Sequence, residues 1–247
     1  MEPPAFVDCH SHVCPSGDDG ARSVADGAVL CRDASRHGTA VLFATPHVWP
    51  HLPLSKKREC KVRAAFEALA PQAGVELRLG FELTPDPPLL REEPERYRLG
   101  GTDRVLMEVP FSGPTDDLVA LAEHVERWGL KPVIAHPERT ECVLDRPELA
   151  HQLAERWLLQ VNASSLLGNH GPQIERLAWR FVEQRIVGAV ASDGHRLTRP
   201  ARLDAAFALV AARIGPEAAR PLFDGSALGV LPATGQPAVV ADARPGR

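Results

Sequence analysis

Short apolar runs recur along the whole chain, and each one ends beside a side chain that can bind a metal ion or a phosphate. The seven runs and the polar residues that follow them are Ala5–Val7 before Asp8, His10 and His12; Ala40–Ala44 before His47; Val75–Phe81 before Glu82; Val105–Met107 before Glu108; Val133–Ala135 before His136; Leu158–Val161 before Asn162; and Gly188–Ala191 before Asp193 and His195. Strands that alternate with helices close into a barrel whose functional residues gather at the C-terminal ends of the strands. The pattern therefore predicts that residues scattered over the chain meet at one mouth.

Helical spacing fills the segments between the apolar runs. From Ser23 to His37, apolar residues recur at helical spacing, and Gly38 follows as a stop signal. Thr115 before two aspartates, with Gly129 further on, predicts another start and stop. The predicted helices are Ser23–His37, Leu54–Leu69, Thr115–Trp128, Glu148–Trp157, Ile174–Gln184, Ala201–Ile214 and Pro216–Phe223. This alternation predicts the α/β class, with seven βα units in a (β/α)7 barrel.

Length and composition allow one such barrel and exclude several other classes of protein. The 247 residues, 44% of them apolar, suffice for a single core, and no internal repeat or second domain is visible. We expect residues 1–231 to form this domain and residues 232–247, rich in Pro, Gly and Ala, to form a flexible tail. A net charge of −4 provides no basic field for nucleic acid. No apolar run reaches the roughly 18 residues that a membrane-spanning helix needs.

The N-terminal sequence and the cysteines predict a cytoplasmic protein. MEPPAFVDCHSH lacks the basic and apolar regions of a secretory signal peptide. The five cysteines are odd in number, irregularly spaced and without a CxxC pair, which is typical of reduced thiols. The oligomeric state does not follow from the sequence.

Histidines and acids at the predicted strand ends are the main chemical signal. His10 and His12 point to the same side if this segment is extended. Glu82 and Glu108 follow buried-looking strands, where a carboxylate is costly unless it is paired or bound to metal. Each residue alone could be a hydrogen-bonded core residue or a surface residue, but one metal cluster explains all of them. The candidate ligands are His10, His12, Asp19, His47, Glu82, Glu108, His136, Asp193 and His195.

The ligand types and the nearby arginines indicate phosphate chemistry. Mixed imidazole and carboxylate ligands suit Zn, Mn or Fe better than Ca, and their number implies two or three ions with bridging carboxylates. Three divalent ions would outweigh the four carboxylates and attract an anion. Arg139 and Arg199 follow His136 and His195 closely and could bind phosphate oxygens, although each alone could be a solvated surface arginine. Clustered ions generate hydroxide near neutral pH and stabilise displacement at phosphorus.

Other catalytic signatures are missing from the sequence. No cysteine is followed six residues later by an arginine, so the loop of the thiolate phosphatases is absent. The G-x-S-x-G elbow, the Walker loop and the G-x-G-x-x-G loop are also absent. These absences leave metal-assisted hydrolysis as the favoured chemistry.

Eight segments in fixed order carry a resemblance to a known family. They are DCHSH (Asp8–His12), DDG (Asp18–Gly20), ATPH (Ala44–His47), GFEL (Gly80–Leu83), LMEVP (Leu106–Pro110), AHPER (Ala135–Arg139), VNASSLLG (Val161–Gly168) and SDGH (Ser192–His195). With these segments the chain resembles the polymerase and histidinol phosphatase (PHP) superfamily from its start to about Leu231. Within it, AHPER and VNASSLLG favour the bacterial manganese-dependent protein-tyrosine phosphatases of capsule and exopolysaccharide operons.

The resemblance implies a structure and a set of ligands. The fold would be the PHP fold, a distorted TIM-like barrel of seven strands, and it would hold two or three divalent ions. Manganese is the expected metal, with iron or zinc as alternatives. His10, His12, Glu82, Glu108, His136 and Asp193 would hold two ions, and Asp19, His47 and His195 a third. Arg139 and Arg199 would bind the phosphoryl group and act in catalysis.

The resemblance also implies an activity. The chain would hydrolyse phosphotyrosine on a protein by attack of metal-activated hydroxide. The expected partner is a bacterial tyrosine kinase that controls polysaccharide synthesis and export. Two alternatives stay open. One is a small-molecule phosphatase, for example for histidinol phosphate, and the other is an inactive, metal-bound barrel that serves as an interaction partner.

Overall fold

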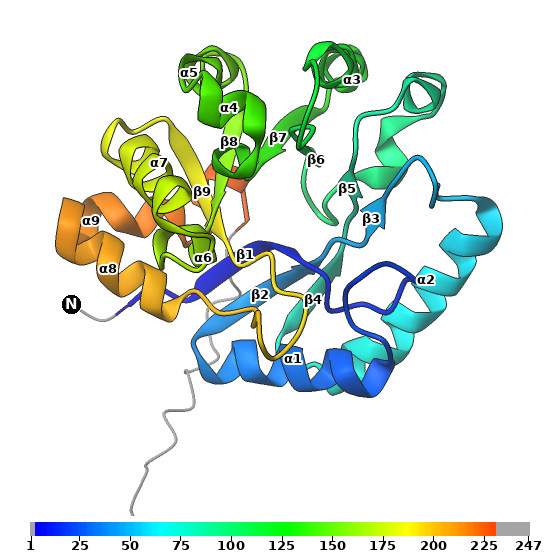
Figure 1. Ribbon diagram of the computed structural model, residues 1–247. Helices are drawn as coiled ribbons and strands as arrows, with labels where there is room; N and C mark the ends of the chain where they lie inside the picture. The colour runs from blue at the N-terminus through cyan, green and yellow to red at the C-terminus, as the bar shows by residue number, and fades with distance from the viewer. Residues whose placement is uncertain (1–2, 231–247) are drawn as a thin grey trace, which may run out of the picture.

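Parallel strands form the centre of the molecule, and helices lie around them (Figure 1). The computed structural model describes residues 3–230. Its strands are β1 (Phe6–Ser11), β2 (Thr39–Ala44), β3 (His47–Val48), β4 (Glu76–Leu79), β5 (Glu82–Leu83), β6 (Arg104–Glu108), β7 (Lys131–Ala135), β8 (Leu158–Asn162) and β9 (Val187–Ala191). The predicted tail, residues 232–247, lies outside the described residues.

Two of the predicted strands are interrupted but continue in line. β2 and β3 are separated by Thr45 and Pro46, and β4 and β5 by Gly80 and Phe81. Proline lacks the N–H that a strand ladder needs, yet the carbonyl oxygen of Pro46 accepts a hydrogen bond from the N–H of Glu82 at 3.2 Å. Gly80 donates to Ala44 at 2.9 Å. These bonds hold the two interrupted strands, β2–β3 and β4–β5, side by side. We call each continuous or interrupted strand of the barrel a stave.

The staves follow one another around the molecule and return to the first. One sheet has the order β1-β2-β4, the other β3-β5-β6-β7-β8-β9, and all the pairings are parallel. The segment after β9 bonds to β1, because Asp193 donates to the carbonyl of His10 at 2.9 Å and His12 donates to that of Gly194 at 2.7 Å. The prediction of a distorted seven-stave barrel is therefore confirmed.

Most predicted helices are confirmed, with small shifts at their ends. The α-helices are α1 (Val24–Arg36), α2 (Lys56–Leu69), α3 (Asp116–Arg127), α4 (Glu141–Asp145), α5 (Glu148–Ala154), α6 (Ala163–Leu166), α7 (Pro172–Glu183), α8 (Asp204–Ile214) and α9 (Pro216–Ala219). The short α4 and α6 were not predicted. The helix predicted over Pro216–Phe223 stops at Ala219 and continues as a 3-10 turn, Arg220–Leu222. Thr115 takes the N-cap position of α3, but its side chain makes no capping hydrogen bond.

One of the seven predicted βα units lacks an α-helix. Between β5 and β6 the described chain forms two 3-10 turns, Pro87–Arg91 and Pro94–Tyr97. Each turn begins with proline, which cannot donate a backbone hydrogen bond and therefore tolerates only the first turn of a helix. The crossover is complete, but it contains no regular helix.

Apolar side chains fill the barrel interior. This inner cluster takes alternate residues from the strands and is completed by Leu99, before β6, and by the C-terminal segment: Val7, Cys9, Val41, Phe43, Leu99, Leu106, Val133, Ala135, Ala189, Ala191, Leu228 and Val230. A larger cluster lies between strands and helices. A packed interior is typical of such barrels, so the open space for chemistry is at the mouth. Among the described residues no helix is long and apolar enough to cross a membrane.

Candidate metal centre

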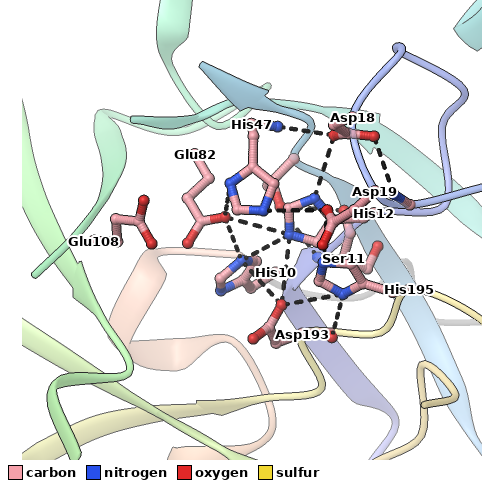
Figure 2. A network of polar contacts seen from close by, with 12 residues as sticks. His10, Ser11, His12, Asp18, Asp19, His47, Glu82, Glu108, Asp193 and His195 are labelled. Atoms are coloured by element: carbon pink, nitrogen blue, oxygen red, sulfur yellow. Dashed lines mark hydrogen bonds and ion pairs between the residues drawn. The ribbon is translucent and has the colours of Figure 1, made fainter. Parts of the chain in front are cut away.

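The C-terminal ends of the strands bring the predicted ligands to one place (Figure 2). Three groups of side chains each offer ligand atoms that lie within 4.8 Å of one another. The groups are His12, Asp19, His47 and His195; His10, Glu82 and His136; and His10, His12 and Asp193. Eight of the nine candidate ligands thus converge, as strand-end placement predicts.

His10 and His12 point into the same space, as the His-x-His spacing predicts. Their Nε2 atoms are 3.2 Å apart, and both rings are buried. The pairing of β1 with β2 is irregular between Asp8 and Ser11, so the strand is distorted where the pair begins. The carboxylate of Asp8 accepts hydrogen bonds from the N–H of His10 at 3.3 Å and from that of Ser192 at 3.0 Å. Asp8 therefore ties β1 to the loop after β9.

Glu82 is the carboxylate around which the histidines gather. Its Oε2 lies 2.8 Å from His47 Nδ1, 3.1 Å from His10 Nε2 and 3.3 Å from His12 Nε2. Its Oε1 lies 2.9 Å from His136 Nε2. Burial by itself would raise the pKa of Glu82, but the charges of His10 and His47 and hydrogen bonds from the histidines hold it well below its usual range. Glu82 is therefore ionised and able to bridge two cations.

Asp193 and His136 hold their positions with an unusual backbone. His136 has φ 35° and Asp193 has φ 51°, a left-handed conformation that is uncommon outside glycine. Such a conformation costs of order 1–3 kcal/mol and persists only where the surroundings enforce it, often at active sites. The Oδ1 of Asp193 lies 3.4–3.6 Å from nitrogen atoms of His10, His12 and His195. The strained turns thus aim both side chains at the cluster.

The three residues expected to hold a third ion, Asp19, His47 and His195, lie together, and His12 joins them. Asp19 Oδ1 lies 3.6 Å from His47 Nε2 and 3.3 Å from His195 Nε2. His12 belongs to this group as well as to that of His10 and Asp193. The resemblance assigned His12 only to the other two ions, so the geometry makes His12 a shared side chain at the centre.

Glu108 is the candidate that none of the three groups includes. It stands apart from the histidines in Figure 2 and accepts a short hydrogen bond from the hydroxyl of Thr84. Burial and the charge of Glu82 raise the pKa of Glu108 to about 8. Two carboxylates that repel each other in a buried place are the environment that a bridging cation relieves. Glu108 remains a proposed ligand.

Both predicted phosphate-binding arginines reach the cluster. Arg139 Nη1 donates to Asp193 Oδ2 at 2.8 Å, and Arg199 Nη2 donates to the same oxygen. The Nε of Arg199 is buried and makes no hydrogen bond within the described chain. A buried guanidinium donor without a partner is costly, and the Arg199 side chain lines the cavity at the mouth.

The residues at the mouth fit divalent ions. Imidazole nitrogens and carboxylate oxygens converge, and the two arginines that approach them both bond to Oδ2 of Asp193, which leaves its Oδ1 facing the histidines. His10 Nε2 and His12 Nε2, at 3.2 Å, can share at most one proton between them, whereas both lone pairs can face a common cation. The Oε2 of Glu82 and the Nδ1 of His136 are buried without a well-aligned hydrogen bond in the described chain.

Several residues that hydrogen-bond to the candidate ligands were not among the predicted site residues. Gln160 on β8 accepts a hydrogen bond from His10 Nδ1 at 3.0 Å, and its amide donates to Asn162 Oδ1 at 2.8 Å. Asn162 in turn donates to Asp193 Oδ2 at 2.7 Å. Asn162 was marked by its position after a predicted strand and by the VNASSLLG segment but was not a predicted site residue, and no motif separated Gln160 from ordinary polar residues. Metal-ligating histidines commonly bond to such outer partners.

Asp18 and Arg58 also support the site, through contacts with His12 and His47. The carboxylate of Asp18 lies 3.5 Å from His12 Nδ1 and accepts a hydrogen bond from the N–H of His47 at 3.0 Å. Burial opposes ionisation of Asp18, but the hydrogen bond and charge of His12 lower its pKa below the usual range. Arg58 is buried and donates to the carbonyl oxygens of His47 and Leu52. The DDG sequence is the signal that could have identified Asp18 beside Asp19.

Comparison with known proteins identifies relatives over nearly the whole described chain. A family profile described as "Capsular polysaccharide synthesis, CpsB/CapC" matches residues 6–231. The tyrosine-protein phosphatase YwqE of Bacillus subtilis is 30% identical over 204 residues, which cover 78% of each chain. The tyrosine-protein phosphatase CpsB of Streptococcus agalactiae is 25% identical over 245 residues, covering 92% of this chain and 98% of the relative.

A solved structure agrees with these relatives. It comes from a study of YwqE from Bacillus subtilis and CpsB from Streptococcus pneumoniae, described as unique metal-dependent tyrosine phosphatases. The TM-score is 0.79 at 28% identity, and the match covers 88% of this chain and 91% of that chain.

Proposed function

Since the chain belongs to the CpsB/CapC family, we propose that it is a metal-dependent phosphatase that hydrolyses phosphotyrosine on proteins. The observation that carries the proposal is the mouth itself, where three convergent groups of histidine and carboxylate ligands lie beside two arginines on one carboxylate. An inactive interaction barrel would not need to keep such a set. The proposed ligands are His10, His12, Asp19, His47, Glu82, Glu108, His136, Asp193 and His195.

The chain's own residues orient the phosphate ester. Arg139 and Arg199 are held by Asp193 and both line the cavity at the mouth, so their remaining N–H groups can bind phosphoryl oxygens. Fixed donors of this kind stabilise the charge that develops at phosphorus during displacement. When bound, divalent ions supply Lewis acidity and lower the pKa of water at the site.

Several finer assignments belong to the same proposal. Manganese is the proposed metal, because mixed imidazole and carboxylate ligands suit it, and the number of ions is two or three. The proposed substrate is a bacterial tyrosine kinase of polysaccharide synthesis and export, supported by the description of the family as one of capsular polysaccharide synthesis. We place the protein in the cytoplasm, as the sequence predicts, and treat residues 1–231 as one catalytic domain.

The test compares substrates on one preparation. The manganese-loaded protein is assayed on a phosphotyrosine peptide, on histidinol phosphate and on para-nitrophenyl phosphate. Turnover of the peptide well above that of histidinol phosphate supports the proposal. Preference for histidinol phosphate would indicate the small-molecule phosphatase, and no turnover of any ester by protein with confirmed metal content would indicate the inactive barrel.

A further inference from the structure

We propose that Trp49 and Phe111 are the specificity-determining residues of this site, and that their rings form two walls for the aryl group of phosphotyrosine. The inference rests on the proposed function, since it takes the phosphoryl group to bind beside Arg139 and Arg199. These rings would distinguish an aryl phosphate from an alkyl phosphate, whereas the metal ligands and arginines serve both.

The two residues line one cavity of about 440 Å³ and follow strands that flank β5. Trp49 directly follows β3, and Phe111 lies in the loop after β6. Strand β5 pairs with both β3 and β6 and therefore runs between them. Thr84, just after β5, lines the cavity between the two rings. Metal ligands and the two arginines line the rest, including Asp19, Glu108, Asp193 and His195.

Phe111 forms one wall beside the phosphate-binding side. Its ring centroid lies 5.5 Å from the guanidinium carbon of Arg139 and 6.0 Å from the ring of His136, at an angle of 28°. Its carbonyl oxygen accepts a hydrogen bond from the N–H of Glu141 at 3.0 Å, which anchors the loop to α4. The side chain is nevertheless 47% exposed. An anchored, exposed aromatic ring over a polar mouth is suited to receive an apolar group.

Trp49 forms the opposite wall on the side of the third ligand group. Its ring stacks on His47 with centroids 4.3 Å apart and an angle of 23°. The N–H of Leu52 donates to the carbonyl of Trp49 at 2.9 Å, which closes a tight turn. Arg58 binds both ends of this turn, at the carbonyls of His47 and Leu52, at 2.8 and 2.7 Å. The wall is therefore held in place before a substrate binds.

The chemistry of the walls selects an aryl group. A phosphotyrosyl ring presents two faces to stack on aromatic rings, whereas a serine or sugar phosphate presents none. A favourable aromatic pair typically contributes enough to change affinity by roughly 2- to 10-fold beyond the area it buries. Two walls together therefore account for a preference of about 4- to 100-fold, on top of phosphate binding common to all esters.

The experiment measures binding of inert phosphonates, because aryl esters are intrinsically more reactive and turnover alone would not report recognition. Dissociation constants of benzylphosphonate and ethylphosphonate are measured by calorimetry on manganese-loaded protein. We expect wild type to prefer benzylphosphonate about 10-fold or more. Trp49→Ala and Phe111→Ala should each reduce that ratio several-fold, with the affinity for ethylphosphonate kept within about twofold. Trp49→Phe, which keeps a ring, should restore most of the ratio.

A matched control is available on the outside of the molecule. Trp128 follows α3, is 45% exposed and does not line the cavity. Trp128→Ala should leave the ratio unchanged. Equal loss of both phosphonates in the Phe111 variant would show that Phe111 only positions Arg139, and would overturn the inference.

The failures of the two proposals are distinguishable. A protein that prefers benzylphosphonate but hydrolyses no phosphate ester would refute the proposed function and leave the aryl site standing. A protein that hydrolyses phosphotyrosine but binds the two phosphonates equally would refute the aryl site and leave the phosphatase standing.

Discussion

Asp193 connects the proposed metal ligands with the two arginines that we propose to bind phosphate. One of its oxygens faces three histidine rings, and the other accepts hydrogen bonds from Arg139, Arg199 and Asn162. Burial opposes its ionisation, yet the charge of His10 and a hydrogen bond from His12 hold its pKa well below the usual range. A single carboxylate therefore orients both kinds of group.

Substitution of Asp193 should remove metal and activity together. In Asp193→Asn the amide removes the charge that the cations need, so we expect loss of metal and a fall in kcat greater than the roughly 10- to 100-fold typical of outer partners. His136→Ala should behave similarly. Elemental analysis and peptide turnover measure both effects. Asp116→Asn, at an exposed position of α3, is the control. Full activity of the Asp193 variant with little bound metal would refute the assignment.

Arg139 should affect turnover and not metal content. It contacts Asp193 but is not itself a ligand. We expect Arg139→Ala to lower kcat/KM for a phosphotyrosine peptide by about 10²–10³, the usual effect of losing a preorganised donor. Arg139→Lys should recover only part, since a point charge does not reproduce the guanidinium fork. Metal content is measured alongside. Unchanged kinetics would make Arg139 a surface residue, and lost metal would make it structural.

At the scale of elements, β8 supports the site although none of the candidate ligands lies on it. Gln160 and Asn162 are two apart on an extended strand and so point to one side. They form a chain of hydrogen bonds from the ring of His10 to the carboxylate of Asp193. The strand thereby fixes the orientation of ligands that belong to β1 and to the loop after β9.

Removal of this series of hydrogen bonds should weaken metal binding at the site. Loss of an outer partner typically costs about 10- to 100-fold in metal affinity or activity, so we expect that range for the manganese affinity of Gln160→Leu. Gln160→Glu keeps an acceptor for His10 but loses the donor to Asn162, and should be intermediate. Manganese binding is followed by electron paramagnetic resonance. An unchanged affinity in Gln160→Leu would limit the residue to a packing role.

Glu138, in the 3-10 turn after β7, should make stability depend on pH. Its Oε1 accepts from the N–H of Asn162 and the hydroxyl of Ser165, and burial raises its pKa from 4.5 to about 7. The folded protein therefore holds this proton more tightly than the unfolded chain, so its contribution to stability falls as pH rises from 4.5 to about 7. It levels off above that range.

The variant Glu138→Gln isolates this effect. Thermal unfolding of metal-free wild type and variant is compared from pH 4 to pH 8. We expect the melting temperature of the variant to gain on that of wild type through the window and then to stay parallel. A constant difference across the whole range would mean that Glu138 does not titrate there.

At the scale of the whole molecule, metal binding joins staves that are distant in sequence. The ligand groups draw on β1, β3, β5 and the loops after β1, β7 and β9. An ion that binds only this folded arrangement stabilises it by mass action. The metal should therefore stabilise the barrel as a whole and not one loop.

Chelation tests this coupling. At free manganese about 100 times the dissociation constant, each bound ion adds roughly 2.7 kcal/mol, and one ion alone therefore corresponds to about 5–10 °C in melting temperature for a domain of this size. We expect a chelator to lower the melting temperature by at least that amount and abolish turnover, and manganese to restore both. Full turnover by protein that elemental analysis shows to be metal-free would contradict the metal site.

The sequence by itself determined the barrel and most of the ligands. The alternation of apolar runs and helical spacing predicted the staves, and geometry then requires their C-terminal ends to share one mouth, which is why His47, Glu82 and Asp193 could be grouped from the sequence. Proline-rich turns between β5 and β6 were missed because a crossover needs only to return the chain, and this can be done without a regular helix.

Only the tertiary structure decided how the side chains at the barrel mouth are positioned relative to one another. That His12 is shared, that Glu108 stands apart and that Arg139 and Arg199 meet on one oxygen depends on backbone turns and rotamers that strand-end positions do not specify. The stacking of Trp49 on His47 and of Phe111 on His136 depends likewise on loops held by Arg58 and by the N–H of Glu141. Local patterns place residues at an edge, but contacts between distant segments set their directions, because packing there is a property of the whole fold.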